Sequence, residues 1–202
     1  MRAAVKPMVG IRGRMMCGAC MIAAFAAATA QAGRLADTDW PAYNNTANGQ
    51  RYSQLDQITT ANVKQLQEVC RIKVDDSGTF QAGLVQLDGT LYLTNAHDTL
   101  AIDARSCALR WRNVYRPQQQ DVFQINRGVA YANGKLFRGT PDARLMAIDA
   151  ASGRTLWLQQ VGDPAQGEFF SSVPAVWQGT LIVGAEFFSS VPAVWQGTLI
   201  VG

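Results

Sequence analysis

The sequence has little of the chemistry from which most catalytic and metal sites are built. Its 202 residues include one histidine and four cysteines, and only 16% of them are charged. No zinc-ligand spacing, phosphate-binding glycine loop or nucleophile elbow occurs, which argues against zinc enzymes, P-loop proteins and α/β-hydrolases. The lone His97 stands in "NAHDTLAID" with no second ligand nearby. We expect it to make hydrogen bonds within a blade of sheet rather than to bind a metal.

The first 32 residues are typical of an export signal. A basic head precedes an apolar, alanine-rich stretch from Met15 to Ala30, and Ala30-Gln31-Ala32 places small residues where signal peptidase reads the chain. The apolar run is short for a membrane span. We therefore expect a signal peptide over residues 1–32 that is cleaved rather than kept as an anchor, with no membrane span after cleavage. Cys20 has no leucine three residues before it, which argues against lipid attachment.

The net charge of +3 and the isoelectric point of about 8.8 come from this segment. It holds four of the 18 basic residues and none of the 15 acidic ones, so the rest of the chain has 14 basic and 15 acidic residues. That remainder contains no basic patch. We therefore expect no nucleic-acid partner.

Two of the cysteines, Cys17 and Cys20, belong to the signal segment, where their C-x-x-C spacing predicts no metal or redox site. Cys70 and Cys107 remain as an even pair in a chain bound for an oxidising compartment, in which disulfides persist. We predict a Cys70–Cys107 bridge, although the sequence does not fix the distance between them.

Three segments line up by a glycine that recurs every 45 residues. They are "LVQLDGTLYLTN" around Gly89, "VAYANGKLFRGT" around Gly134 and "PAVWQGTLIVGA" around Gly179. In each, an apolar run leads into a tight turn of the D-G, N-G or Q-G kind, and a second alternating run follows. This order predicts a β-hairpin.

A second motif repeats with an offset of 46 residues. "AIDARSCALRW" (Ala101 to Trp111) matches "AIDAASGRTLW" (Ala147 to Trp157). Each predicts a strand end, an aspartate that bonds turn amides, and a tryptophan that covers apolar area between sheets. Only Thr59 to Leu66 reads as a short helical turn. A four-stranded unit of about 45 residues is typical of a β-propeller blade, so the sequence predicts an all-β propeller with about three blades present and the ring not closed.

The opening of the mature chain carries a family resemblance. "DWPAYNNTANGQRYSQLDQITTANVKQL" (Asp39 to Leu66), "NRGVAY" (Asn126 to Tyr131) and "GTPDARLMAIDAASGRTLW" (Gly139 to Trp157) resemble the PQQ-dependent (quinoprotein) alcohol dehydrogenases. The resemblance implies an N-terminal fragment of an eight-bladed periplasmic propeller that binds pyrroloquinoline quinone with calcium or a lanthanide. It also implies an alcohol-type substrate, hydride transfer to the quinone, and a cytochrome c as electron acceptor.

The resemblance also implies roles for individual residues. Arg127 in "NRG" matches the family arginine that bonds the cofactor, for which its planar, always-charged fork is suited; the alternative is a surface arginine before a glycine turn. Gln81 falls where the family carries a cofactor-contacting glutamate or glutamine. Ser171 aligns with a cofactor-contacting threonine, or is a strand-end serine. Where many members have two adjacent cysteines, this chain has Asp121 and Val122.

The resemblance implies that the family's base, an aspartate, its metal-binding asparagine and the tryptophan beneath the quinone lie in later blades. No catalytic residue is therefore assigned, and we expect the chain to be inactive by itself. The family's metal-binding glutamate would follow Gly184, but Glu186 only copies Glu168. We therefore do not assign Glu186 as a metal ligand.

The chain ends on an unbroken duplication. Residues 168–184 return without a change as 186–202, an interval of 18 residues, whereas the diverged blade repeats recur after 45 or 46. A unit of this length holds one hairpin and omits the aspartate-turn-tryptophan segment. We therefore expect residues 33–184 to form the genuine blades and residues 185–202 to be a recent duplication or an assembly error. A different class, a non-catalytic propeller scaffold of the outer-membrane assembly lipoprotein type, stays open as an alternative.

Overall fold

The computed structural model describes residues 38–46, 48–74, 80–119 and 121–184, together with two short strands, 186–187 and 198–201, for which only the backbone is described. The expected signal segment, residues 1–32, lies outside the described residues. Within these ranges the regular structure is strand apart from two short 3-10 helices, η1 (Val63–Gln65) and η2 (Pro164–Gln166). No helix in this part of the chain is long and apolar enough to cross a bilayer.

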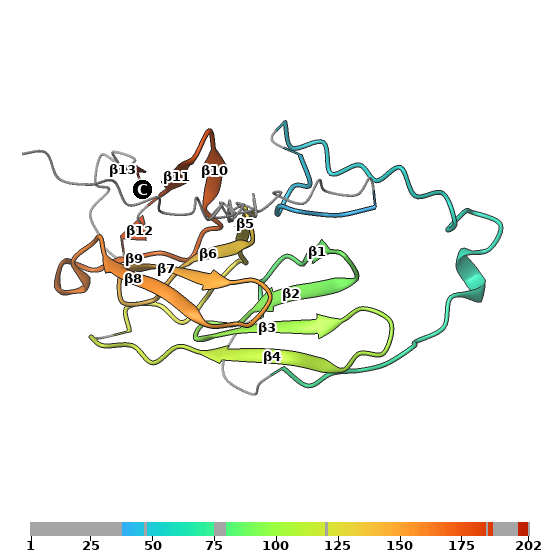
Figure 1. Ribbon diagram of the computed structural model, residues 1–202, viewed down its shortest axis with the longest axis horizontal. Coiled ribbons are helices and arrows are strands. Elements are labelled where there is room, and N and C mark those ends of the chain that lie inside the picture. Colours follow the sequence, from blue (N-terminus) through green and yellow to red (C-terminus); the bar gives the residue numbers. More distant parts are fainter. Residues whose placement is uncertain are drawn as a thin grey trace, which may run out of the picture. The chain divides into compact units, whose positions relative to one another are not determined.

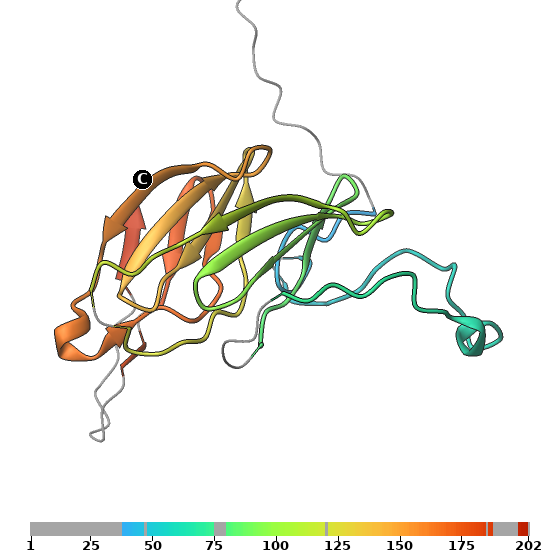
Figure 2. The same ribbon diagram turned by 90° about the horizontal axis from the view of Figure 1, so that it is seen from below.

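Two complete four-stranded antiparallel sheets form the centre of the described region (Figure 1), with their strands hydrogen-bonded in chain order. The strands of the first sheet are β1 (Val85–Leu87), β2 (Thr90–Thr94), β3 (Asp98–Asp103) and β4 (Leu109–Val114). Those of the second are β5 (Ala130–Ala132), β6 (Lys135–Gly139), β7 (Arg144–Asp149) and β8 (Thr155–Gln160). Figure 2 shows the twist of these strands from a second direction. Both sheets confirm the predicted blade unit.

The recurring glycine turns form the predicted hairpins. Asp88 and Gly89 have φ angles of 43° and 67° between β1 and β2, and Asn133 and Gly134 have 48° and 75° between β5 and β6. Two successive positive φ angles are the mark of a type I′ turn, whose twist suits adjacent strands. The D-G and N-G pairs therefore fix the register of the first two strands of each blade.

A third sheet contains β10 (Ala175–Trp177), β11 (Thr180–Val183) and β13 (Thr198–Val201), in that order. Its last strand belongs to the second copy of the terminal duplication. A separate pair joins β9 (Glu168–Phe169) to β12 (Glu186–Phe187), which is also an original paired with its copy. Thr180 faces Val201 at the position where Thr90 faces Asp103 in the first blade. The copy thus supplies a third strand without the aspartate that ends the genuine ones.

The first two sheets pack through a docked tryptophan. Trp111 Nε1 donates to the carbonyl oxygen of Ala150 at 3.1 Å, and the hydroxyl of Tyr92 donates to the same oxygen at 3.1 Å. A Cβ added at Gly153 would lie 2.5 Å from the Trp111 ring, so only glycine allows this approach. Trp157, its repeat partner, contacts Phe137 of its own sheet and stays 40% exposed.

A disulfide joins Cys70 to Cys107, with Cα atoms 6.4 Å apart and a sequence separation of 37 residues. Cys107 has a φ of 59° and stands at the turn position that Gly153 occupies, with φ 72°, in the next blade. The bridge ties the β3–β4 turn to the segment 48–74. Apolar side chains of that segment are widely exposed, Val69 among them at 83%. Few packing contacts hold this segment, so the bridge constrains it strongly.

We expect Cys70→Ser to lower the free energy of unfolding of the full chain by about 4 kcal/mol, the loop-closure entropy of a loop of this size. Urea unfolding of the oxidised protein measures it. Cys107→Gly opens the same bridge but suits the left-handed backbone, so it is expected to be about 1 kcal/mol more stable than Cys107→Ser. Equal stability of the Gly and Ser variants would show that the turn does not strain residue 107.

Candidate functional site

Residues before the innermost strands of successive blades meet through main-chain hydrogen bonds. Gly83 N donates to the carbonyl oxygen of Arg127 at 2.9 Å, and Arg127 N donates to that of Ser171 at 2.8 Å. The main chain of Arg127 is therefore hydrogen-bonded to the first blade through its carbonyl oxygen and to the third blade through its amide. Gln81, two residues before Gly83, is exposed.

The structure brings Arg127 and Ser171 together through their side chains as well. The half-buried guanidinium of Arg127 donates through Nη1 to the hydroxyl oxygen of Ser171. Ser171 is completely buried. Its hydroxyl thus supports the guanidinium from behind. The cofactor contacts assigned to Arg127, Gln81 and Ser171 from the sequence stay predictions.

A cavity of about 620 Å³ lies in front of Arg127. Its wall includes Tyr43, Asn44, Tyr131, Ser172 and Trp177, and the lining contains no other charged side chain besides Arg127. Neither Gln81 nor Ser171 lines it. A pocket with aromatic walls and a single guanidinium favours a planar, anionic ligand.

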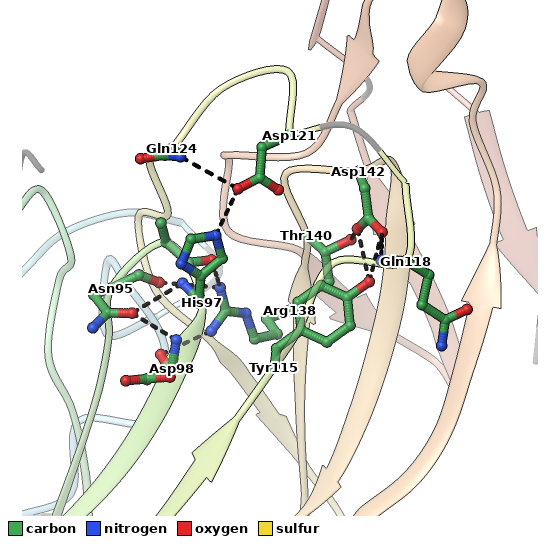
Figure 3. Close-up of polar contacts among 11 residues, drawn as sticks. Asn95, His97, Asp98, Tyr115, Gln118, Asp121, Gln124, Arg138, Thr140 and Asp142 are labelled. Carbon is green, nitrogen blue, oxygen red and sulfur yellow. Dashed lines mark hydrogen bonds and ion pairs between the residues drawn. The ribbon is translucent and has the colours of Figure 1, made fainter. Parts of the chain in front are cut away.

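Asp121 is paired with the only histidine of the chain. His97 Nε2 and Asp121 Oδ2 are 2.7 Å apart, and Gln124 donates to the same oxygen at 3.4 Å (Figure 3). Val122 N donates to the carbonyl oxygen of Pro141 at 3.1 Å. The two positions at which the resembled family carries cysteines thus fasten the loop leading to Arg127. The hydrogen-bonding role expected for His97 is confirmed, and its partner comes from the next blade.

A fully buried arginine lies behind this loop. The guanidinium of Arg138 on β6 donates to the carbonyl oxygens of Ala96 and Asp98 at 2.6 and 2.8 Å, in the β2–β3 turn of the preceding blade (Figure 3). Burial lowers the pKa of Arg138 to about 10, although the nearby Asp98 carboxylate opposes the shift. The side chain therefore stays charged at neutral pH and joins the two sheets.

A second buried network surrounds Asp142. The Tyr115 hydroxyl donates to both of its carboxylate oxygens at 2.7 and 2.8 Å, and the Thr140 hydroxyl and Gln118 N donate at 2.7 and 2.9 Å. Burial acts to raise the pKa of Asp142, but the hydrogen bonds from Thr140, Tyr115 and Gln118 prevail and lower it. Burial and the same carboxylate raise the pKa of Tyr115. The carboxylate is thus held ionised beside the start of the loop.

No three His, Cys, Asp or Glu side chains gather into a metal site within the ranges that the structure describes. Glu186, which was not assigned as a metal ligand because it copies Glu168, has its side chain outside those ranges.

Sequence reasoning missed three residues of this region. Ser172, which lines the cavity with Arg127, lies 45 residues after it, so the repeat spacing contained the signal. Asn126 stands within the "NRG" motif, but nothing in the motif marks it as a buried hydrogen-bonding centre. Arg138 sits in an ordinary hairpin strand and carries no signal of burial.

Comparisons with known proteins identify related sequences and structures. A family model described as the glucose/ethanol/alcohol dehydrogenase β-propeller domain, designated PQQ, matches residues 40–202. The chain is 34% identical over 182 residues to the quinohemoprotein alcohol dehydrogenase ADH IIB of Pseudomonas putida, which covers 84% of this chain and 26% of the relative. It is 31% identical over 158 residues to the lanthanide-dependent methanol dehydrogenase of Methylacidiphilum fumariolicum, with 72% and 25% covered.

Solved structures match as well. That of the quinohemoprotein alcohol dehydrogenase ADHIIG from Pseudomonas putida HK5 has a TM-score of 0.69 and 32% identity, over 75% of this chain and 23% of that one. The structure of a europium-containing methanol dehydrogenase has a TM-score of 0.68 and 29% identity, over 75% of this chain and 28% of that one. These matches confirm the predicted propeller fold. The chain spans about a quarter of the length of the relatives it matches.

The Asp142 network predicts a pH dependence of stability. Its carboxyl has a lower pKa folded than unfolded, so its contribution is complete above pH ~4 and is lost as the pH falls through the folded value. Asp142→Asn should therefore lower stability at pH 7, by about 1–3 kcal/mol, and flatten the fall in stability below pH ~4. Urea unfolding from pH 7 to pH 2 measures both effects. The exposed Asp56 makes none of these bonds, so Asp56→Asn should keep the wild-type profile; a wild-type profile for Asp142→Asn would contradict the assignment.

Proposed function

The chain belongs to the family of glucose, ethanol and alcohol dehydrogenase β-propeller domains, and we propose that it forms part of a PQQ-dependent enzyme that oxidises alcohols. The observation that carries this proposal is the half-buried Arg127 facing an aromatic-walled cavity at the junction of three blades. A guanidinium that a buried serine supports and that faces this cavity favours a ligand-binding role over a non-catalytic scaffold.

The described residues fit pyrroloquinoline quinone, which is planar and carries carboxylates. Arg127 supplies the only charge in the cavity lining, and Tyr43, Tyr131 and Trp177 supply flat apolar surface. When bound, the quinone supplies the hydride acceptor. Arg127 would hold an anionic edge of the cofactor, Ser171 would keep the guanidinium in place, and Ser172 would add a hydroxyl to the cavity wall.

The remaining features of the proposal concern the whole protein. A calcium or lanthanide ion beside the cofactor is supported by the likeness to a lanthanide-dependent methanol dehydrogenase. A cytochrome c as electron acceptor follows from the family resemblance. The sequence of residues 1–32 supports export to the periplasm.

We expect the 202-residue chain to bind the quinone through Arg127. Titration with pyrroloquinoline quinone should quench tryptophan fluorescence, because Trp177 lines the cavity. Arg127→Ala should weaken binding by about 10- to 100-fold, the usual loss for a hydrogen bond to a charged group, and Arg127→Lys by less. Arg116 is exposed and does not line the Arg127 cavity, so Arg116→Ala is the matched control. Equal affinity of the Arg127→Ala and Arg116→Ala proteins would refute the proposed site.

We expect no alcohol oxidation by the 202-residue chain alone. No acidic group lines the Arg127 cavity to act as a base, and no metal cluster occurs among the described residues. The assay measures reduction of an electron-accepting dye with ethanol, pyrroloquinoline quinone and Ca²⁺ or La³⁺ supplied. Steady turnover above the protein-free rate would show that this chain carries its own base and metal site.

A further inference from the structure

Asn126 occupies a repeat position that places it directly behind Arg127. Gln81, Asn126 and Ser171 follow one another at intervals of 45 residues, each before the innermost strand of a blade. Gln81 is exposed, whereas Asn126 is only 2% exposed. We propose that Asn126 is a positioning residue, which does not touch the cofactor but fixes the backbone from which Arg127 reaches the cavity. This inference rests on the proposed function of Arg127.

The carboxamide of Asn126 bonds three separate elements. Its Oδ1 accepts from the Thr94 hydroxyl at 2.7 Å and from Gly128 N at 3.0 Å. Its Nδ2 donates to the carbonyl oxygen of Gly139 at 3.1 Å. Thr94 ends β2 of the preceding blade and Gly139 ends β6. The side chain therefore ties the loop to a strand end in each of the two complete sheets.

The backbone beside Arg127 is closely packed. Gly128 has a φ of 134°, and a Cβ there would lie 3.1 Å from the carbonyl oxygen of Gly83 and 3.3 Å from Val173. Arg127 N donates to Ser171, and the next amide along the chain, Gly128 N, donates to the side chain of Asn126. The two amides that flank the Cα of Arg127, its own and that of Gly128, are thus both hydrogen-bonded, and together they set the direction of the Arg127 side chain.

Without the Thr94 hydroxyl, Asn126 Oδ1 keeps only the bond from Gly128 N, and the side chain of Asn126 is no longer tied to β2, so the loop can shift. Such a movement begins one residue from the guanidinium. Small displacements of a binding group cost affinity, because a charged hydrogen bond depends on distance and direction. Loss of the Thr94 hydroxyl should therefore weaken quinone binding although Thr94 does not line the cavity.

Thr94→Val removes only this hydroxyl and keeps the shape of the side chain. We expect quinone affinity in the 202-residue chain to fall about three- to tenfold, and hydrogen–deuterium exchange to speed up at the amides of residues 126–128. The effect on affinity should vanish in an Arg127→Ala background, because Thr94 acts through Arg127. Additive losses in the double variant would overturn the inference.

The matched control is Thr99→Val. Thr99 faces Thr94 across β2 and β3, is equally buried, and accepts a hydrogen bond from Arg138 instead. It should lower the unfolding temperature without changing exchange at residues 126–128. Equal exchange in the two valine variants, or wild-type exchange in Thr94→Val, would overturn the inference.

Asn126→Asp provides a second test if Thr94→Val does not fold. It keeps the oxygen that accepts from Thr94 and Gly128 and replaces the NH₂ group that bonds Gly139 with a carboxylate oxygen, which the Gly139 carbonyl oxygen repels. The same local rise in exchange is expected, and wild-type exchange would count against the role of Asn126. If the wild-type chain binds no quinone, the proposed function fails, and the exchange result alone decides the positioning role.

Discussion

The guanidinium of Arg138 must find all of its partners inside the protein, because none of it reaches water. A buried charge is tolerated only when hydrogen bonds replace its hydration. It finds them in the β2–β3 turn of the preceding blade, at the carbonyl oxygens of Asn95, Ala96 and Asp98. This turn lies between the two contacts that hold the Arg127 loop, since Thr94 precedes it and His97 is part of it. One desolvated side chain therefore bonds the turn that carries both of these contacts.

Much of the scaffold could be predicted because it follows from local rules. The D-G and N-G pairs require positive φ angles, so they marked two hairpins and their register. The recurrence of the aspartate-turn-tryptophan motif showed where the third strand of a blade ends and the fourth begins. Trp111 docks on the second sheet, as expected for a large apolar side chain at this repeat position. Trp157 keeps more exposure than its repeat position implies, because docking depends on the neighbouring sheet rather than on the motif itself.

The interior polar contacts could not be predicted in the same way. Asn126 and Thr94 are 32 residues apart, and Asp121 and His97 are 24 apart, so no local pattern links them. Their meeting depends on how one sheet is placed against the next. A motif could identify Arg127 as a candidate ligand group. Only the assembled sheets show that Ser171 supports it from behind and that Ser172 shares its cavity.

The pairing of β11 with β13 has a consequence for the behaviour of the chain in concentrated solution. Both strands have the sequence Thr-Leu-Ile-Val, and they pair antiparallel, so that the first residue of each strand faces the last residue of the other. A strand with this sequence can therefore pair with another strand of the same sequence. The same edge of one molecule can therefore accept the strand of a second molecule with no change of register. Strand exchange between two molecules would use the same hydrogen bonds as the pairing within one chain, so higher protein concentration would favour it.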